Sequence, residues 1–312
     1  MQGLLSSYFE LGVLIPDILK EKGNNIITIS EGGNTFLSPN IETKVDLKII
    51  TKQIENRMQQ NYYTLMNLLP KIDIDIFISF IGEYIPLDLV NEMSKQGTIT
   101  INWDENDPYP DDKREDGVIT FWKKSRAYDV LWGAHRFTPN WLPLAAYTDI
   151  ESYHVTECER NIDLGFIGNT TYETRVKWFK TINDAGLNVF RPNESFIDYR
   201  QIKNFYSHTK IVPNTHKNST INGRVFEATA NGALLITDYA PGLEDCFEFG
   251  KEIILMENDG IEQIKYFLEN DDERKKIAKA GFERTIKDHK MEYRLDKMIE
   301  DSVNGNVWKW RK

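Results

Sequence analysis

The stretch that decides the fold runs from Thr220 to Phe249 and reads TINGRVFEATANGALLITDYAPGLEDCFEF. Near its start, Asn222 can cap a helix, because its side-chain oxygen can accept a hydrogen bond from a backbone N–H that has no partner inside the helix. Gly232 stands where a helix commonly ends in a left-handed turn. These two residues therefore predict a short helix that is bounded at both ends.

The interior of this helix divides into two faces. Arg224 and Glu227 are three positions apart and share one face, while Phe226 and Ala230, four positions apart, share another. The first face carries a cation and a carboxylate, and the second is apolar and suited to packing. Arg224 and Glu227 form either a surface ion pair or a pair of ligand contacts, and both interpretations are open at this point.

A buried strand is predicted directly after the helix. Residues 233–236 read ALLI, an apolar run of strand length without alternation, as is typical of a parallel sheet that is covered on both faces. The run ends in Thr237 and Asp238, before a turn at Gly242. Ligands of open parallel sheets bind beyond the carboxyl ends of strands, beside helix N-termini that favour phosphate. Helix and strand together therefore predict a phosphate-binding edge.

The same residues resemble a known family. An Asn-x-Arg-x-Phe-Glu helix, followed by Ala-x-Gly, a buried strand, Asp, Gly-Leu-Glu and Phe-x-x-Gly-Lys-Glu, is similar to the nucleotide-sugar half of GT-B glycosyltransferases, and most similar to the spore maturation (CgeB-like) group. The likeness is strong over residues 162–290 and loose before them. The matching positions are Asn222, Arg224, Phe226, Glu227, Gly232, Asp238, Gly242, Leu243, Glu244, Phe247, Gly250, Lys251 and Glu252.

The resemblance implies an α/β fold of the GT-B type, with two Rossmann-like domains facing each other across a cleft. It implies that a sugar moves from a nucleotide-diphosphate sugar, the donor substrate, to an acceptor hydroxyl, with no metal ion or other cofactor. The base, the sugar and the acceptor, which is a glycan, a protein or a small molecule, stay open. Independently of the resemblance, the alternation of predicted strands and helices along the chain favours α/β sheets.

The composition is that of an ordinary globular protein. The chain of 312 residues is long enough for two domains with full cores. A formal net charge of -10 argues against a general nucleic-acid binder, because neutralising phosphates requires basic patches. Cys158 and Cys246 do not have the spacing of a metal site or of a redox motif, so we expect both to pack as small apolar side chains. No apolar run reaches the roughly 18 residues that span a bilayer, and the start lacks a signal sequence, so we expect a cytoplasmic protein.

The first domain is predicted over residues 1–155. Its first helix, over 4–22, begins almost at Met1, so the strand and glycine turn that usually open a Rossmann-like domain are either missing or precede the chain. A polar segment without periodicity, 148–160, marks the domain boundary. The further elements predicted for this domain are strands over 25–29, 45–50, 74–80, 98–103 and 128–132, and helices over 51–69 and 86–95.

The second domain, residues 156–294, is expected to bind the nucleotide sugar. The resemblance implies that the C-terminal helix, residues 295–312, crosses back to cover the first domain, with Trp308 and Trp310 as its anchors. The predicted elements of the second domain are strands starting at 162, 187, 210 and 233, and helices over 173–185, 199–208, 222–231, 261–269 and 272–288, with a last helix over 290–303.

The donor site is predicted at the carboxyl edge of the second sheet. The resemblance implies that Glu227 binds the ribose diol and that Arg224 and Gly168 lie near the pyrophosphate, where a glycine permits close backbone approach. Arg175 follows in the first helical turn after Gly168, and His216 in the loop after the third strand faces the same edge, as does Lys217. The predicted donor-binding residues are Gly168, Asn169, Asn214, Asn222, Arg224, Glu227, Asp238 and Glu244.

Other roles for some of these residues stay open. Asn222 is at least a helix cap, and Asp238 and Glu244 could serve the turns that follow the strand instead of a ligand. Gly168 could belong to a plain strand-to-helix turn.

The catalytic residues are predicted to be Asp104, Asp107 and Glu227. Both aspartates follow a predicted strand of the first domain, and an ionised carboxylate there could act as general base on the acceptor hydroxyl. Both could equally cap a turn. Retaining GT-B enzymes often carry a second glutamate eight positions before the first, but Ser219 stands there, so retention and inversion are both open.

No metal site is predicted. Asp73 and Asp75 form an Asp-x-Asp pattern, which chelates a divalent cation in the other glycosyltransferase fold. Directly before an apolar strand, however, the pattern is more typical of a solvated sheet edge.

Two other functions compete with glycosyl transfer. The first is a sugar-nucleotide epimerase or hydrolase on the same fold, which would form product from the donor alone. The second is a non-catalytic sugar- or nucleotide-binding protein of a spore or surface assembly, which would bind without turnover.

Overall fold

The computed structural model describes residues 15, 18–23, 56, 59–60, 62–63, 66–67, 73–82, 85–104, 121–146, 159–168, 170, 172–192, 199–216 and 220–309. The predicted features that lie outside this part are the strands over 25–29 and 45–50, Asp107, Cys158, Asn169, Lys217, Ser219 and Trp310. The chain divides into two compact units. Residues 1–24 and 144–294 form the five-strand unit, and residues 25–143 and 295–312 form the three-strand unit. The boundary near residue 155 stays a prediction, because residues 147–158 are outside the described part.

The sheet of the five-strand unit is parallel throughout, in the order β5-β4-β6-β7-β8. The strand predicted over 233–236 is confirmed as β7, which is buried along its whole length. Its register with β6 pairs Asn214 with Thr237, so both strands end at the same edge. The strands are β4 (Ile162–Gly165), β5 (Val189–Phe190), β6 (Thr209–Asn214), β7 (Leu234–Thr237) and β8 (Ile254–Leu255).

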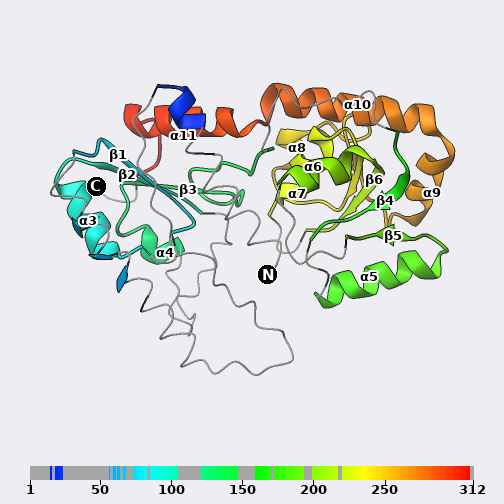
Figure 1. Ribbon diagram of the computed structural model, residues 1–312, viewed down its shortest axis with the longest axis horizontal. Helices are drawn as coiled ribbons and strands as arrows, with labels where there is room; N and C mark the ends of the chain where they lie inside the picture. Colours follow the sequence, from blue (N-terminus) through cyan, green and yellow to red (C-terminus); the bar gives the residue numbers. More distant parts are fainter. Residues whose placement is uncertain are drawn as a thin grey trace. The chain divides into compact units, whose positions relative to one another are not determined.

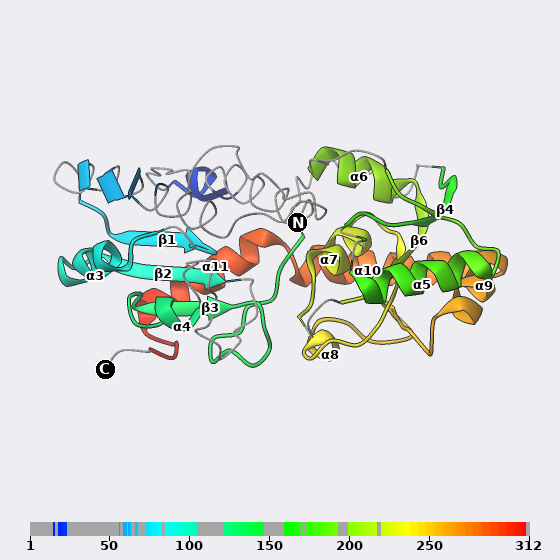
Figure 2. The same ribbon diagram turned by 90° about the horizontal axis from the view of Figure 1, so that it is seen from below.

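Helices cover both faces of this sheet. Figures 1 and 2 show α5 on one side and α6, α7 and α10 on the other. The order of the strands explains this, because right-handed connections from β4 out to β5 and back across to β6 require helices on opposite faces. The elements α8 and β8 were not predicted, because they are too short to show the periodicity of a helix or a strand in the sequence. The helices are α5 (Glu173–Asp184), α6 (Tyr199–Ser207), α7 (Gly223–Ala230), α8 (Leu243–Cys246), α9 (Ile261–Glu269) and α10 (Asp271–Asp288).

The predicted central helix is α7, and one of its two predicted boundaries is confirmed. Gly232 has a φ of 65° and ends the helix in a left-handed turn. The prediction for Asn222 was wrong in part: the residue occupies the N-cap position, but its side chain makes no capping hydrogen bond. Its amide nitrogen instead donates to the side-chain oxygen of Asn214 at 3.2 Å, because the end of β6 places that oxygen beside the helix start.

The three-strand unit also has a parallel sheet, in the order β1-β2-β3. The last helix, α11 (Met291–Asn304), begins in the five-strand unit, and its residues from Leu295 on belong to the three-strand unit. There Trp132 donates from its indole nitrogen to the Ser302 hydroxyl at 3.1 Å. The elements before α11 are β1 (Ile76–Phe80), α3 (Leu87–Lys95), β2 (Ile99–Asp104), α4 (Phe121–Lys124) and β3 (Val130–Gly133).

Trp308 does not anchor the C-terminal segment through its ring. The side chain is exposed, and the main chain makes the contact: the Trp308 N–H donates to the Asn140 side-chain oxygen, and the Asn140 amide donates to the Trp308 carbonyl, both at 2.8 Å. Trp310 lies outside the described residues.

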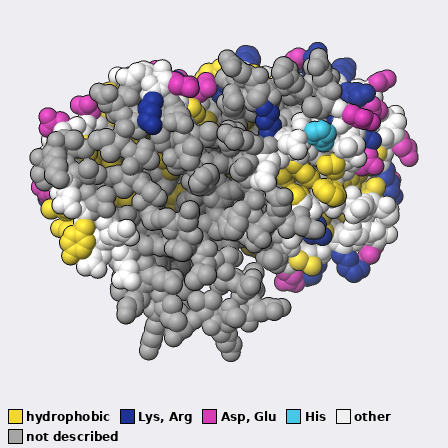
Figure 3. All heavy atoms as spheres, in the orientation of Figure 1, with side chains coloured by type: hydrophobic (Ala, Val, Ile, Leu, Met, Phe, Trp, Pro, Cys, Tyr) yellow, Lys and Arg dark blue, Asp and Glu magenta, His cyan; other side chains and the backbone are white. Residues whose placement is uncertain are grey.

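The surface of the five-strand unit is mixed in charge. On the face in Figure 3, Lys and Arg side chains are interspersed with Asp and Glu. Several lie on helices at four-residue spacing, such as Lys177 with Glu173 and Lys180 with Asp184 on α5. Such exposed pairs contribute little to stability and leave the buried side chains of the helices to hold them on the sheet.

Close packing of α10 requires a glycine. A Cβ at Gly281 would overlap the backbone carbonyl oxygen of Glu252. We therefore expect Gly281→Ala to lower the free energy of unfolding by about 1–3 kcal/mol, although alanine favours helices. Urea unfolding followed by circular dichroism measures the change, with Lys279→Ala at an exposed position of α10 as control. Equal stability of Gly281→Ala and the wild type would contradict this close approach.

Beneath α7, His289 is buried between the rings of Phe226 and Phe247, with centroid distances of 5.3 and 5.0 Å. Its Nε2 donates to the Cys246 carbonyl at 2.8 Å, and its Nδ1 accepts from the Arg294 guanidinium at 2.9 Å. Burial is the main reason why the pKa of His289 falls to about 4, and the charge of Arg294 lowers it further. The folded protein therefore holds this imidazole neutral.

This burial predicts a loss of stability in acid. The folded pKa of His289 is about 4 and its ordinary value is 6.5, so between these values the unfolded chain binds more protons than the folded chain. The contribution of His289 is present above pH 6.5 and is lost as the pH falls towards 4, by up to about 3 kcal/mol. Urea unfolding at pH 4 and at pH 6.5 measures this loss of unfolding free energy. His289→Gln should reduce the pH dependence and His208→Gln, on a partly exposed histidine, should not; identical pH profiles for all three proteins would contradict the assignment.

Candidate functional site

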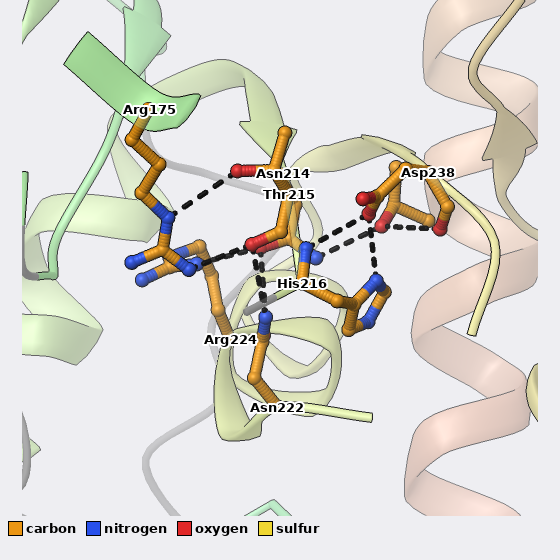
Figure 4. Close-up of polar contacts among 8 residues, drawn as sticks. Arg175, Asn214, Thr215, His216, Asn222, Arg224 and Asp238 are labelled. Atoms are coloured by element: carbon orange, nitrogen blue, oxygen red, sulfur yellow. Dashed lines mark hydrogen bonds and ion pairs between the residues drawn. The ribbon is translucent and has the colours of Figure 1, made fainter. Parts of the chain in front are cut away.

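The candidate site lies at the carboxyl edge of β4, β6 and β7 in the five-strand unit. Three segments that follow these strands meet the first turns of α5 and α7 there (Figure 4). Open parallel sheets bind ligands at this edge. The segments are Phe166–Gly168 after β4, Thr215–His216 after β6 and Asp238 after β7, and the helices contribute Arg175 and Arg224.

Arg224 is the best-fixed side chain of the site. Its Nε donates to the Ile167 carbonyl at 2.7 Å, and its Nη1 donates to the Asn214 side-chain oxygen at 2.6 Å. The guanidinium stacks on the ring of Phe166 at 4.0 Å. It is only 8% exposed. These contacts are all with neutral groups, so they orient the cation without neutralising it.

Gly168 makes room for this arginine. It has a φ of 145°, a conformation that is nearly exclusive to glycine, and a Cβ at this position would overlap Nη2 of Arg224. The predicted glycine turn is therefore present, and the structure shows a packing reason for the glycine.

A second buried cation lies beside the first. Arg175 donates from Nη2 to the Thr215 carbonyl at 2.7 Å, and its guanidinium is 5.5 Å from the ring of Phe166. Burial lowers the pKa of Arg175 to about 10, with the charge of Arg224 as the second cause. Two buried guanidinium groups at the N-terminal ends of two helices favour an anion beside them, while the carboxylates of Asp238 and Glu227 act on the same two cations.

Glu227 lies one helical turn further along α7. The side chain is partly buried, and burial raises its pKa, while the charge of Arg224 opposes this rise. Gly223 leaves space beside the carboxylate, because a Cβ there would lie 3.3 Å from Oε1 of Glu227. Arg224 is held by Ile167 and Asn214 rather than by a surface pairing with Glu227, so this carboxylate is available to a hydroxyl donor.

The other predicted acidic residues have partners within the chain. Asp238 accepts hydrogen bonds from both the backbone N–H and Nδ1 of His216, at 2.9 and 2.7 Å. Glu244 accepts from the Tyr239 hydroxyl at 2.9 Å and from the Gly242 N–H at 3.1 Å. Glu244 therefore braces the turn after β7, which was the alternative left open for it, whereas Asp238 orients a histidine of the site.

Asp104, predicted as a catalytic base, lies in the three-strand unit at the end of β2. Its carboxylate is fully buried and forms an ion pair with Lys124 at 2.6 Å. Lys124 also donates to the Ile81 carbonyl, and Ile81 has an unusual positive φ of 65°. The other predicted base, Asp107, lies outside the described residues.

Sequence reasoning missed two contributors to the site. No role was predicted for Phe166 or Tyr206, yet the ring of Phe166 supports both guanidinium groups, and the buried Tyr206 hydroxyl accepts from the Ile167 N–H at 3.2 Å. Burial raises the pKa of Tyr206 well above its usual range, so its hydroxyl stays protonated. The position of Phe166 beside a glycine turn was an available signal, but Tyr206 near the C-terminal end of α6 had none.

Among the described residues, no group of three or more His, Cys, Asp or Glu side chains is placed to hold a metal ion. The same part of the chain contains no helix that is long and apolar enough to cross a membrane.

Comparisons with known proteins agree with this geometry. Residues 159–300 match the model of the family described as glycosyl transferase-like. No curated protein matches the sequence significantly. The matched residues include the whole candidate site.

Solved structures show the fold. A glycosyltransferase from Rickettsia africae ESF-5 aligns with a TM-score of 0.58 and 12% identity, over 95% of this chain and 94% of that one. Anabaena HepE, solved with UDP and glucose, gives 0.52 and 10% identity over 83% and 82%. A putative UDP-N-acetylglucosamine 2-epimerase from Listeria monocytogenes gives 0.55 and 11% identity over 97% and 95%. The fold is α/β and of the GT-B type, with parallel Rossmann-like sheets, as predicted.

Because Gly168 leaves space for Arg224, we expect substitutions at these two positions to be coupled in their effect on stability. Gly168→Ala should destabilise the protein by about 1–3 kcal/mol, because the new methyl group displaces the guanidinium. In an Arg224→Ala background the same change should cost less, since the clash is gone. Urea unfolding of the four proteins in this double-mutant cycle measures the difference.

Gly186→Ala is the matched control, because Gly186 also has a positive φ, 80°, but open space around its Cβ position. If Gly168→Ala lowers the free energy of unfolding equally in both backgrounds, the loss is due to backbone strain alone. That result would contradict the contact with Arg224.

Proposed function

We propose that this protein is a metal-independent glycosyltransferase that moves a sugar from a nucleotide-diphosphate sugar to an acceptor hydroxyl. The observation that carries the proposal is the pair of buried guanidinium groups of Arg175 and Arg224 at the carboxyl edge of a parallel sheet. A diphosphate would supply the negative charge that this edge requires. The match of residues 159–300 to the glycosyl transferase-like family supports the same function.

The diphosphate would contact the first turns of α5 and α7. Arg224 presents a planar guanidinium that is already oriented by Ile167 and Asn214, so little side-chain entropy is lost on binding. Backbone N–H groups at Gly168 and Asn169 and at the start of α7 would add hydrogen bonds. As the diphosphate leaves, these fixed donors and the two arginines would stabilise its growing charge in place of a divalent cation.

Glu227 would hold the ribose. A carboxylate can accept two hydrogen bonds from a vicinal diol, and this one lies one turn beyond Arg224, next to the space above Gly223. Anabaena HepE, which shares the fold, was solved with UDP and glucose, and this supports a uridine diphosphate sugar as the first donor to test.

In the reaction, the acceptor oxygen forms a bond to the anomeric carbon, and the bond from that carbon to the diphosphate oxygen breaks. The hydroxyl proton passes to a carboxylate base. The buried pairing of Asp104 with Lys124 favours Asp107 over Asp104 for this role. Retention and inversion at the anomeric carbon are both compatible with this arrangement. A cytoplasmic location and membership of the CgeB-like group complete the proposal.

A sugar-nucleotide epimerase is the second candidate, because the fold also aligns with a putative epimerase over 97% of this chain. Incubation with the donor alone separates the two, since an epimerase or hydrolase forms product without an acceptor. Binding of the donor with no turnover under any condition would favour the non-catalytic binding protein.

The donor site can be tested by thermal stabilisation with a panel of nucleoside diphosphates and their sugars. A ligand at 100 times its dissociation constant should stabilise the wild type by about 2.7 kcal/mol. Arg224→Ala should weaken binding roughly tenfold to hundredfold, because it removes charged hydrogen bonds to the diphosphate, and Glu227→Gln should weaken it by about tenfold. Arg224→Lys should recover only part of the affinity, since it keeps the charge but not the planar fork.

Arg191→Ala, on an exposed arginine of the same unit, is the control and should bind as the wild type does. If no nucleotide stabilises the wild type, the proposed donor site is wrong. If a chelator abolishes transfer, the metal-independent mechanism is wrong.

A further inference from the structure

Two buried polar atoms of the site have no hydrogen-bond partner among the described residues: Nε2 of His216 and Oδ1 of Asn222. The side chain of His216 is only 2% exposed. Leaving a buried polar atom unsatisfied is costly, so each of these atoms points to a ligand or solvent group that completes it. Thr215 lies beside both: it precedes His216 in the chain, and its carbonyl accepts from the Asn222 amide at 3.4 Å.

The hydrogen-bond network identifies both atoms as acceptors. Nδ1 of His216 lies 2.7 Å from the Asp238 carboxylate, which can only accept, so the proton is on Nδ1. In the neutral imidazole, Nε2 then carries a lone pair. The amide nitrogen of Asn222 donates to the Asn214 side-chain oxygen and to the Thr215 carbonyl, which fixes the remaining amide atom, Oδ1, as an acceptor.

While the imidazole is neutral, both atoms are acceptors, and a phosphate oxygen cannot complete them. Ionised phosphate oxygens also accept and cannot donate, whereas a sugar hydroxyl donates readily. The arginines at the same edge already provide the donors that a diphosphate needs. A sugar hydroxyl can therefore complete both atoms, taking the place of water in the free protein.

Resting on the proposed function, we propose that His216, held in one tautomer by Asp238, binds a hydroxyl of the transferred sugar, and that Asn222 binds a second hydroxyl of the same ring. Asp238 is then a positioning residue, and His216 with Asn222 forms a sugar subsite beside the diphosphate subsite of Arg224. The pair would contribute to the choice of sugar, because its strength depends on where the ring presents its hydroxyls.

The test compares a nucleoside diphosphate with its sugar conjugate at pH 8, where imidazole is normally neutral. Isothermal titration calorimetry measures both affinities on the wild type, His216→Ala, His216→Phe, Asn222→Ala and Asp238→Asn. We expect each change at His216 and Asn222 to weaken the affinity for the sugar conjugate about three- to tenfold more than the affinity for the free diphosphate. Asp238→Asn should also weaken the conjugate alone, since an amide permits the other tautomer.

The free diphosphate serves as the folding control for every variant, and His216→Phe keeps a ring in the space if His216→Ala is unstable. His208→Ala, on a histidine bonded to the Asn204 carbonyl of its own helix, should change neither affinity. If a variant loses affinity equally for both ligands, His216 contacts the ribose, base or phosphate, and the sugar subsite is wrong. If neither affinity changes, the sugar subsite is also wrong. If neither ligand binds the wild type, the proposed donor site fails and this inference fails with it.

Discussion

The site depends on one constraint, which is the fixed position of the Arg224 guanidinium inside the protein. Its hydrogen bonds to Ile167 and Asn214 come from the ends of two different strands, and its plane rests on the ring of Phe166. Gly168 supplies the space, since any side chain there would occupy it. The cation is thus held by β4, β6 and α7 together, and none of these elements could position it alone.

A buried cation is costly to a folded protein, and the site contains two, Arg175 and Arg224. Both side chains lose hydration on burial, and this burial, together with the charge of Arg224, lowers the pKa of Arg175. Binding of an anion would recover part of this free energy. The same residues that reduce the stability of the free protein would therefore favour a diphosphate, which is a common relation between stability and function at binding sites.

The apolar face of α7 shows how the rest of the unit supports this arrangement. Thr229 on that face shares a hydrogen bond with Thr285 of α10 at 2.7 Å, and Phe226 packs on His289. Gly281 lets α10 approach the backbone at Glu252. Because α7 is held rigidly from behind, Arg224 and Glu227 on its other face keep a fixed direction, which preorganised binding requires.

The sequence by itself determined the order of most of the described strands and helices, the left-handed end of α7 at Gly232 and the edge at which Arg224 and Glu227 lie, because periodicity, apolar runs and glycine act over a few neighbouring residues. Only the tertiary structure decided which partners those residues take. Asn222 looked like a cap but donates to Asn214, Glu244 takes its hydrogen bonds from the turn after β7, and the Tyr206 hydroxyl accepts from the Ile167 N–H beside Gly168. Each of these hydrogen bonds depends on groups that other strands and turns bring to the same edge. The local sequence around a residue does not show which groups these are.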